Sequence, residues 1–216
     1  MNGLLRRLFG VVSATLIAPA FAQTAPPELP FPDVSWKALS KAKPATHLKM
    51  GALEVRFEET TLWAISGTAG LGTMHHQGDA GKSIYWLCYT MQGGAQTQRI
   101  WIVAHGEMGG PDHAVTMVTA QELTPTVRPT IDCPALPSTL QPLSLAQDVW
   151  LGVLESEALK VLGRPSYRKG PWRSFDYQSK VPGNCQPDGF DLMNWLVFRT
   201  VQGRIVAISA GQVTSC

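Results

Sequence analysis

The first half of the chain contains short segments in which apolar and polar positions follow strand spacing. Leu53, Val55 and Phe57 alternate with charged residues, which is the pattern of a strand with one face in water. Residues 84–91 are apolar on both faces, which predicts a strand in the centre of a sheet. Further strands are predicted over 61–65, 99–104 and 114–123. We therefore expect an antiparallel meander of about five strands.

The second half changes to helical spacing after an apolar stretch over residues 143–152. Residues 155–162 are predicted to form a helix, because four apolar side chains fall on one helical face: Leu154, Ala158, Val161 and Leu162. Gly163 suits the position just beyond a helix, and Pro165 prevents its continuation.

A strand is predicted over residues 172–177, and a hairpin over 192–200 and 204–210 that turns at Gln202-Gly203. The helix is expected to pack on this sheet and cover its apolar face. The sequence thus predicts an α+β protein that is mostly β. An N-terminal antiparallel meander is followed by a short helix packed on a small antiparallel sheet, and no internal repeat is evident.

Composition divides the chain into five expected segments. A signal peptide over residues 1–22 is followed by a proline-rich extended leader over 23–48, which Trp36 is expected to pin to the body. An antiparallel β region over 49–123 contains a glycine-rich loop at 67–81. A linker over 124–142 contains five prolines, and the helix-plus-sheet module occupies 143–216.

The first 22 residues have the features of a secretory signal. Arg6 and Arg7 precede an apolar run, and Ala20-Phe21-Ala22 has the small-x-small pattern of a cleavage site. The two arginines leave export by the Sec or the twin-arginine route open. Cleavage after Ala22 would leave 16 of the 18 Lys and Arg residues against 16 Asp and Glu, a net charge near zero. This balance argues against nucleic acid as a partner, and we expect a periplasmic or secreted protein without a transmembrane anchor in the mature chain.

Four cysteines lie in the expected mature chain, and an even number in an exported protein indicates two disulfides. Three pairings are possible. We favour Cys88–Cys133 and Cys185–Cys216, since each bond then closes within its own half. No Cys-x-x-Cys spacing supports a metal site instead.

One motif in the second half carries a family resemblance. Gly152, Leu162, Gly163 and Pro165, followed by Trp172 and Tyr177, resemble the helix and aromatic strand of the SmpA/OmlA-type outer-membrane assembly proteins and of the related β-lactamase-inhibitor-protein repeat. Leu154 stands where that family commonly has a helix-capping Thr. The resemblance covers about a third of the chain and implies a module used for protein–protein contact in the bacterial envelope. The motif concerns packing and capping, so it marks no active site.

The histidines form the sharpest polar cluster. An alternative hypothesis is a metal-dependent envelope hydrolase, with ligands at His75, His76, His105, Glu107 and His113. The simpler interpretation is that these histidines and Glu107 are solvated polar residues in turns. The sequence contains no Gly-x-Ser-x-Gly nucleophile elbow and no P-loop. Asp176 and Asp191 lie near aromatic residues in the sequence and are a candidate acid–base pair, but the sequence does not show whether they face each other.

We therefore expect a non-enzymatic binding protein without a cofactor, either an envelope assembly or maintenance factor or an inhibitor or immunity protein. Its partner would be a protein in the envelope or outside the cell. The expected contact surface is the wet face of the C-terminal sheet together with loop residues of the first half: His75, His76, Glu107, Asp112 and His113.

Overall fold

The structure is a computed structural model that describes residues 24–28, 39–93, 96–106, 112–145, 148–185 and 189–216. The expected signal peptide at 1–22, Trp36 and Glu107 lie outside these residues. The described chain is mostly β, as the sequence predicts.

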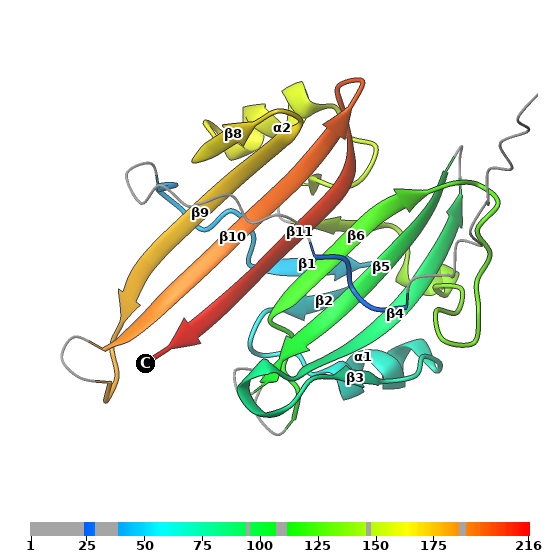
Figure 1. Ribbon diagram of the computed structural model, residues 1–216, viewed down its shortest axis with the longest axis horizontal. Coiled ribbons are helices and arrows are strands. Elements are labelled where there is room, and N and C mark those ends of the chain that lie inside the picture. Colours follow the sequence, from blue (N-terminus) through cyan, green and yellow to red (C-terminus); the bar gives the residue numbers. More distant parts are fainter. Residues whose placement is uncertain (1–23, 29–38, 94–95, 107–111, 146–147, 186–188) are drawn as a thin grey trace, which may run out of the picture.

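Eight antiparallel strands form one continuous sheet, which runs across the whole molecule (Figure 1). The first four strands of this sheet come from the N-terminal half and the other four from the C-terminal half. In spatial order they are β3 (His75–Gln77), β4 (Ile84–Gly93), β5 (Gln96–His105), β6 (Met117–Leu123), β11 (Arg204–Ser215), β10 (Phe190–Val201), β9 (Trp172–Val181) and β8 (Tyr167–Lys169).

The remaining elements cover one face of this sheet, which we call the helix face (Figure 1). The opposite face is called the outer face. A small sheet has the order β2-β1-β7, and two short 3-10 helices span Ala80–Lys82 and Ser138–Leu140. The elements on the helix face are β1 (His47–Met50), β2 (Leu53–Arg56), β7 (Leu143–Leu145), α1 (Leu62–Ala69) and α2 (Glu155–Leu162).

The main core lies between the eight-stranded sheet and the elements on its helix face. Leu62 and Ile65 of α1 and Ala158 of α2 are fully buried against it. The sheet contributes alternate residues of its central strands, which include Ile100, Ile102, Leu196 and Phe198. Both helices thus bury one face against one sheet, and the two halves share a single core.

The two halves repeat the same order of elements, which the sequence did not reveal. In each half an eight-residue helix precedes four antiparallel strands. The helix starts are held alike, because Leu62 N donates to His113 O (3.0 Å) and Glu155 N donates to Gly203 O (2.8 Å). The halves meet edge to edge through their last strands, β6 and β11. The repeat is carried by backbone hydrogen bonds and buried positions that different side chains satisfy, so it leaves little trace in the sequence.

The prediction of a strand over 61–65 is wrong, because this segment begins helix α1. The Thr61 hydroxyl accepts a hydrogen bond from Ala64 N (3.1 Å) and so caps the helix. Gly70 ends it in the left-handed conformation, with φ of 67°. The predicted glycine-rich loop at 67–81 correspondingly contains the end of α1, strand β3 and a 3-10 turn.

Several other predictions are confirmed. Helix α2 has the predicted bounds, and its end at Gly163 has φ of 80°. The hairpin β10–β11 turns at Gln202-Gly203 as expected. The disulfides join Cys88 to Cys133 and Cys185 to Cys216, so each closes within its own half.

The two equivalent helix starts differ in one respect that can be tested. Thr61 caps α1, whereas Leu154 at the start of α2 offers no side-chain acceptor. Thr61→Ala should lower the free energy of unfolding by about 1 kcal/mol, and Leu154→Thr should raise it by a similar or smaller amount. Urea denaturation followed by far-UV circular dichroism measures both changes. Equal effects of the same sign would contradict this account of the helix starts.

Candidate functional site

The outer face of the N-terminal half carries a second apolar cluster. Alternate residues of β4 and β5 point away from the helices, and they bring together Trp86, Cys88, Trp101 and Val103. Cys133 joins this cluster through its disulfide to Cys88. All five are at most 4% exposed, so segments other than helices must cover them. This explains why residues 84–91 are apolar on both faces.

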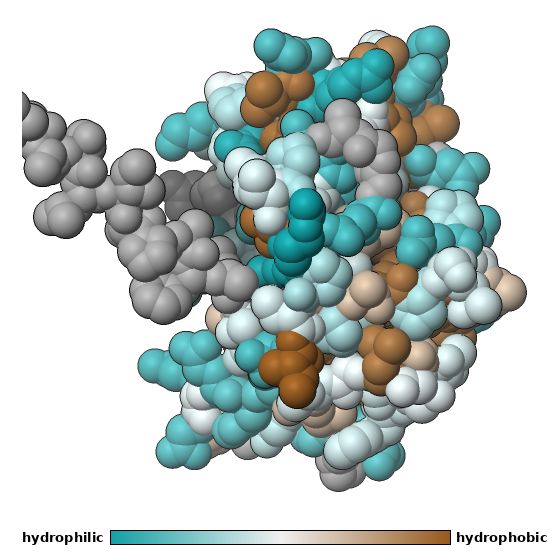
Figure 2. Space-filling view, turned by 90° about the vertical axis from the view of Figure 1, so that its right-hand side faces the viewer, coloured by the Kyte–Doolittle hydropathy of each residue, from teal (hydrophilic) through white to brown (hydrophobic). Residues whose placement is uncertain are grey.

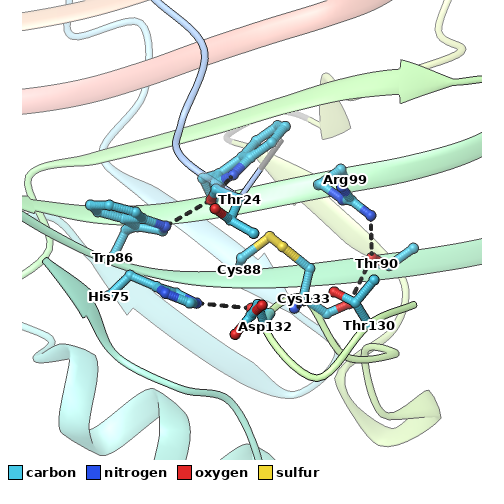
Figure 3. The surroundings of a disulfide bond; sticks show 10 residues. Thr24, His75, Trp86, Cys88, Thr90, Arg99, Thr130, Asp132 and Cys133 are labelled. Atoms are coloured by element: carbon cyan, nitrogen blue, oxygen red, sulfur yellow. Dashed lines mark hydrogen bonds between the residues drawn. A yellow bond between two sulfur atoms is a disulfide. The ribbon is translucent and has the colours of Figure 1, made fainter. Parts of the chain in front are cut away.

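The first cover is the segment around Cys133 (Figure 3). Thr90 binds it with three hydrogen bonds: its N donates to Pro134 O (2.7 Å), its Oγ1 to Cys133 O (2.9 Å), and its O accepts from Leu136 N (2.8 Å). His75 Nε2 lies 2.9 Å from Asp132 O, and because a carbonyl only accepts, Nε2 carries the proton. The disulfide and these bonds fix the segment over β4.

The second segment that covers the cluster is residues 24–28, near the start of the expected leader. From here on, the leader means these five residues. The Nε1–H groups of Trp86 and Trp101 both donate to the carbonyl oxygen of Thr24, each at 2.8 Å (Figure 3). With the leader in place Trp86 is 4% exposed and Trp101 0%, and the Thr24 carbonyl supplies the acceptor that two indole donors withdrawn from water require. Ala25 packs against the same cluster. The leader is therefore pinned through Thr24 and Ala25.

Beside the leader, the outer face is hollowed into an open cavity of about 460 Å³. Pro26, Pro27 and Glu28 form one wall, and the strands supply the others with residues that include Val103, His105 and Met117. Two buried hydroxyls line its floor, where Thr119 Oγ1 donates to Ser209 Oγ (3.0 Å). Burial lowers the pKa of His105, whose Nδ1 lies 2.7 Å from Thr116 Oγ1. This favours a neutral imidazole at neutral pH.

The structure separates the histidines that the sequence groups together. His75 stacks on Trp86 of the outer face, with ring centroids 5.4 Å apart. His76 and His113 instead stack on either side of Tyr85, at 4.3 and 3.9 Å, and the Tyr85 side chain packs against the main core. Within the part of the chain that the structure describes, no three His, Cys, Asp or Glu side chains form a metal-binding group. Asp112 is exposed, and Glu107 lies outside the described residues.

The outer face of the C-terminal half has a different character. Strands β9 and β10 direct four partly exposed large side chains to this side: Trp172, Met193, Trp195 and Arg199. We call these four residues and Asp176 the platform. The Arg199 guanidinium lies over the Trp172 ring, 6.0 Å from its centroid. Met193 is 37% exposed. Aromatic, Arg and Met side chains are the types enriched in protein interfaces.

Asp176 lies opposite Trp195 on this platform. Desolvation by burial raises the pKa of its carboxyl group, and the hydrogen bond from Ser174 Oγ (2.8 Å) opposes that shift. Asp191 is on the same face but four residues farther along, a distance of about 13 Å at strand spacing. It pairs with Lys180 (3.1 Å). The two carboxylates therefore do not form an acid–base pair.

The motif residues of the second half serve packing and chain direction. Gly152 has φ of 82° and donates its N–H to Ile205 O (2.8 Å), while Gly163 N donates to Leu159 O (2.9 Å). Pro165 is buried, Trp172 begins β9, and Tyr177 lies farther along the same strand. No pattern in the sequence indicates the joint role of Trp86, Trp101 and Thr24, since only the folded sheet brings them together.

No family model matches the chain, and neither a curated protein nor a solved structure gives a significant match. Among the described helices, none is long and apolar enough to cross a membrane. The case for a function therefore depends on the two parts of the outer face.

The partly buried carboxylate of Asp176 predicts a pH-dependent gain of stability on substitution. Its pKa is raised in the folded state, so ionisation opposes folding, and stability is lost as the pH rises from the ordinary value of 3.8 through the folded-state pKa. Asp176→Asn should raise the melting temperature at pH 7, and the gain should vanish below pH 3.8, where Asp176 is neutral in both states. Calorimetry over this range measures it.

Asp191→Asn is the matched control, because that carboxylate is 43% exposed. It should change the melting temperature little at any pH. A gain for Asp176→Asn that is equally large at pH 3 and pH 7 would contradict the electrostatic explanation.

Proposed function

We propose that this chain is an exported, non-enzymatic binding protein of the bacterial envelope and that the platform on β9 and β10 contacts its protein partner. The observation that carries the proposal is the platform itself. It places Trp172, Trp195 and Arg199, which belong to residue types that dominate binding energy in interfaces, on a sheet face that none of the described helices covers.

The chemistry of the platform favours a partner with a mixed apolar and basic surface. Met193 and the two indoles offer apolar area, and Arg199 is already engaged with Trp172. Asp176 is a partly buried carboxylate whose ionisation costs stability. A partner Lys or Arg would offset that cost by pairing with it.

Other observations support the same class of function. The two disulfides suit a protein that folds in an oxidising compartment. The resemblance of the second half to SmpA/OmlA-type and β-lactamase-inhibitor modules leads to the same expectation of protein contact. The side of the molecule at the right of Figure 1 is a weaker candidate, since its apolar residues are scattered among polar ones (Figure 2).

The loop residues first expected to bind the partner contribute less in this proposal. His75 holds the Cys133 segment, and His76 and His113 stack on Tyr85. These contacts give each imidazole an internal role. We therefore assign the main contact to the sheet face and give the exposed Asp112 no part in it.

Affinity capture with matched variants tests the proposal. The oxidised chain from Gln23 to Cys216 would be immobilised and exposed to envelope extract, beside the platform variant Met193→Lys with Asp176→Asn and the control variant Trp63→Ala. Trp63 is 60% exposed on α1, on the other side of the molecule, so it is the control aromatic. Wild type and Trp63→Ala should bind the same saturable partner, and the platform variant should bind it at least tenfold more weakly, since it adds a cation and removes the carboxylate that would pair with the basic partner.

The partner would then be purified and its affinity measured by calorimetry with each variant. A partner that the platform variant binds as tightly as wild type would contradict the proposed surface. Recovery of no saturable partner by any of the three proteins would contradict the proposed function.

A further inference from the structure

The pair of indoles on the outer face forms a built site for a peptide carbonyl. Trp86 comes from β4 and Trp101 from β5, and both Nε1–H groups point at one oxygen, that of Thr24, at 2.8 Å (Figure 3). Both side chains are more than nine-tenths buried. Two convergent indole donors on one sheet face form a preorganised pair that a single carbonyl oxygen can accept.

The segment that supplies this acceptor has the chemistry of a bound peptide. Residues 24–28 read Thr-Ala-Pro-Pro-Glu, and consecutive prolines favour the extended polyproline conformation that aromatic surfaces recognise. Among the described residues, no backbone–backbone hydrogen bond joins this segment to the body. It is held by the Thr24 carbonyl and by the packing of Ala25.

The cavity extends this site beyond the leader. Pro26, Pro27 and Glu28 form only one wall of the 460 Å³ cavity, and the partly buried Ile84 and Met117 are apolar residues elsewhere in its lining. A peptide with larger side chains than the leader could cover more of this surface. The leader stays bound because it belongs to the same chain as the site, which gives it an effective concentration on the order of mM.

We propose that the outer face around Trp86 and Trp101 is a binding site for an extended, proline-containing peptide segment of another protein, and that residues 24–28 occupy it as an intramolecular competitor. The site lies on the N-terminal half of the sheet and does not depend on the platform. It therefore goes beyond the proposed function, and either proposal can fail without the other.

The test supplies the leader sequence in trans. A chain that begins at Leu29 leaves the site empty, and its fold is checked by circular dichroism and by the absence of free thiols. An acetylated and amidated peptide of residues 23–28 (Gln-Thr-Ala-Pro-Pro-Glu) is then titrated into it, with tryptophan emission and calorimetry as readouts. We expect saturable one-to-one binding with a blue shift of the emission. The chain from Gln23 should bind the peptide at least tenfold more weakly, because its own leader competes.

Two variants of the shortened chain identify the site. Trp86→Phe with Trp101→Phe keeps two apolar rings but removes both donors, and it should bind the peptide at least tenfold more weakly. Trp63→Phe removes an exposed indole from α1 and should leave binding unchanged. Ala25→Asp in the chain from Gln23 is a second way to open the site if the shortened chain does not fold, since a carboxylate cannot remain in the apolar cluster.

Failure of the peptide to bind either opened chain would overturn the proposal and leave the leader as a structural strap. If the opened chain and the chain from Gln23 bound the peptide equally well, residues 24–28 would not act as a competitor. Binding that survives the double Phe substitution would overturn the role of the two indoles.

Discussion

The pairing of β6 with β11 is the interaction on which the rest of the molecule depends. Five residue pairs, from Ala207 with Gln121 to Gly211 with Met117, join two four-stranded halves into one sheet. Because the last strands of both halves meet here, the helices α1 and α2 fall on the same side and share one core. The opposite side becomes a single outer face, and the buried hydroxyls of Thr119 and Ser209 lie at the seam.

The outer face is treated differently in the two halves. In the first half, Trp86 and Trp101 are covered by a disulfide-anchored segment and by the leader. In the second half, Trp172 and Trp195 remain partly exposed. The two halves therefore differ in how this face is covered. The first half holds its own chain against the sheet, and the second half carries the surface that we propose contacts a partner.

Both parts of the outer face, the platform and the indole pair Trp86 and Trp101, contain features that do not serve stability alone. Burial raises the pKa of Asp176, so the platform retains a carboxylate that costs stability at neutral pH. The Nε1–H groups of Trp86 and Trp101 both donate to the carbonyl oxygen of Thr24, so the N-terminal half depends on a short segment near the expected mature N-terminus. Such features have a ready explanation in binding and a poor one in packing alone.

The sequence by itself determined the class of fold, helix α2, the β10–β11 hairpin and, through the preference for closure within each half, the disulfide pairing. The helix and the hairpin follow from local periodicity, caps and turns: Gly163 ends α2, and Gln202 lies in the turn of the hairpin. Only the tertiary structure decided that 61–65 is a helix, that the halves repeat, and that the grouped histidines lie on different faces. Thr24, Trp86 and Trp101 are up to 77 residues apart, and contacts at that separation depend on sheet order, which local patterns do not encode.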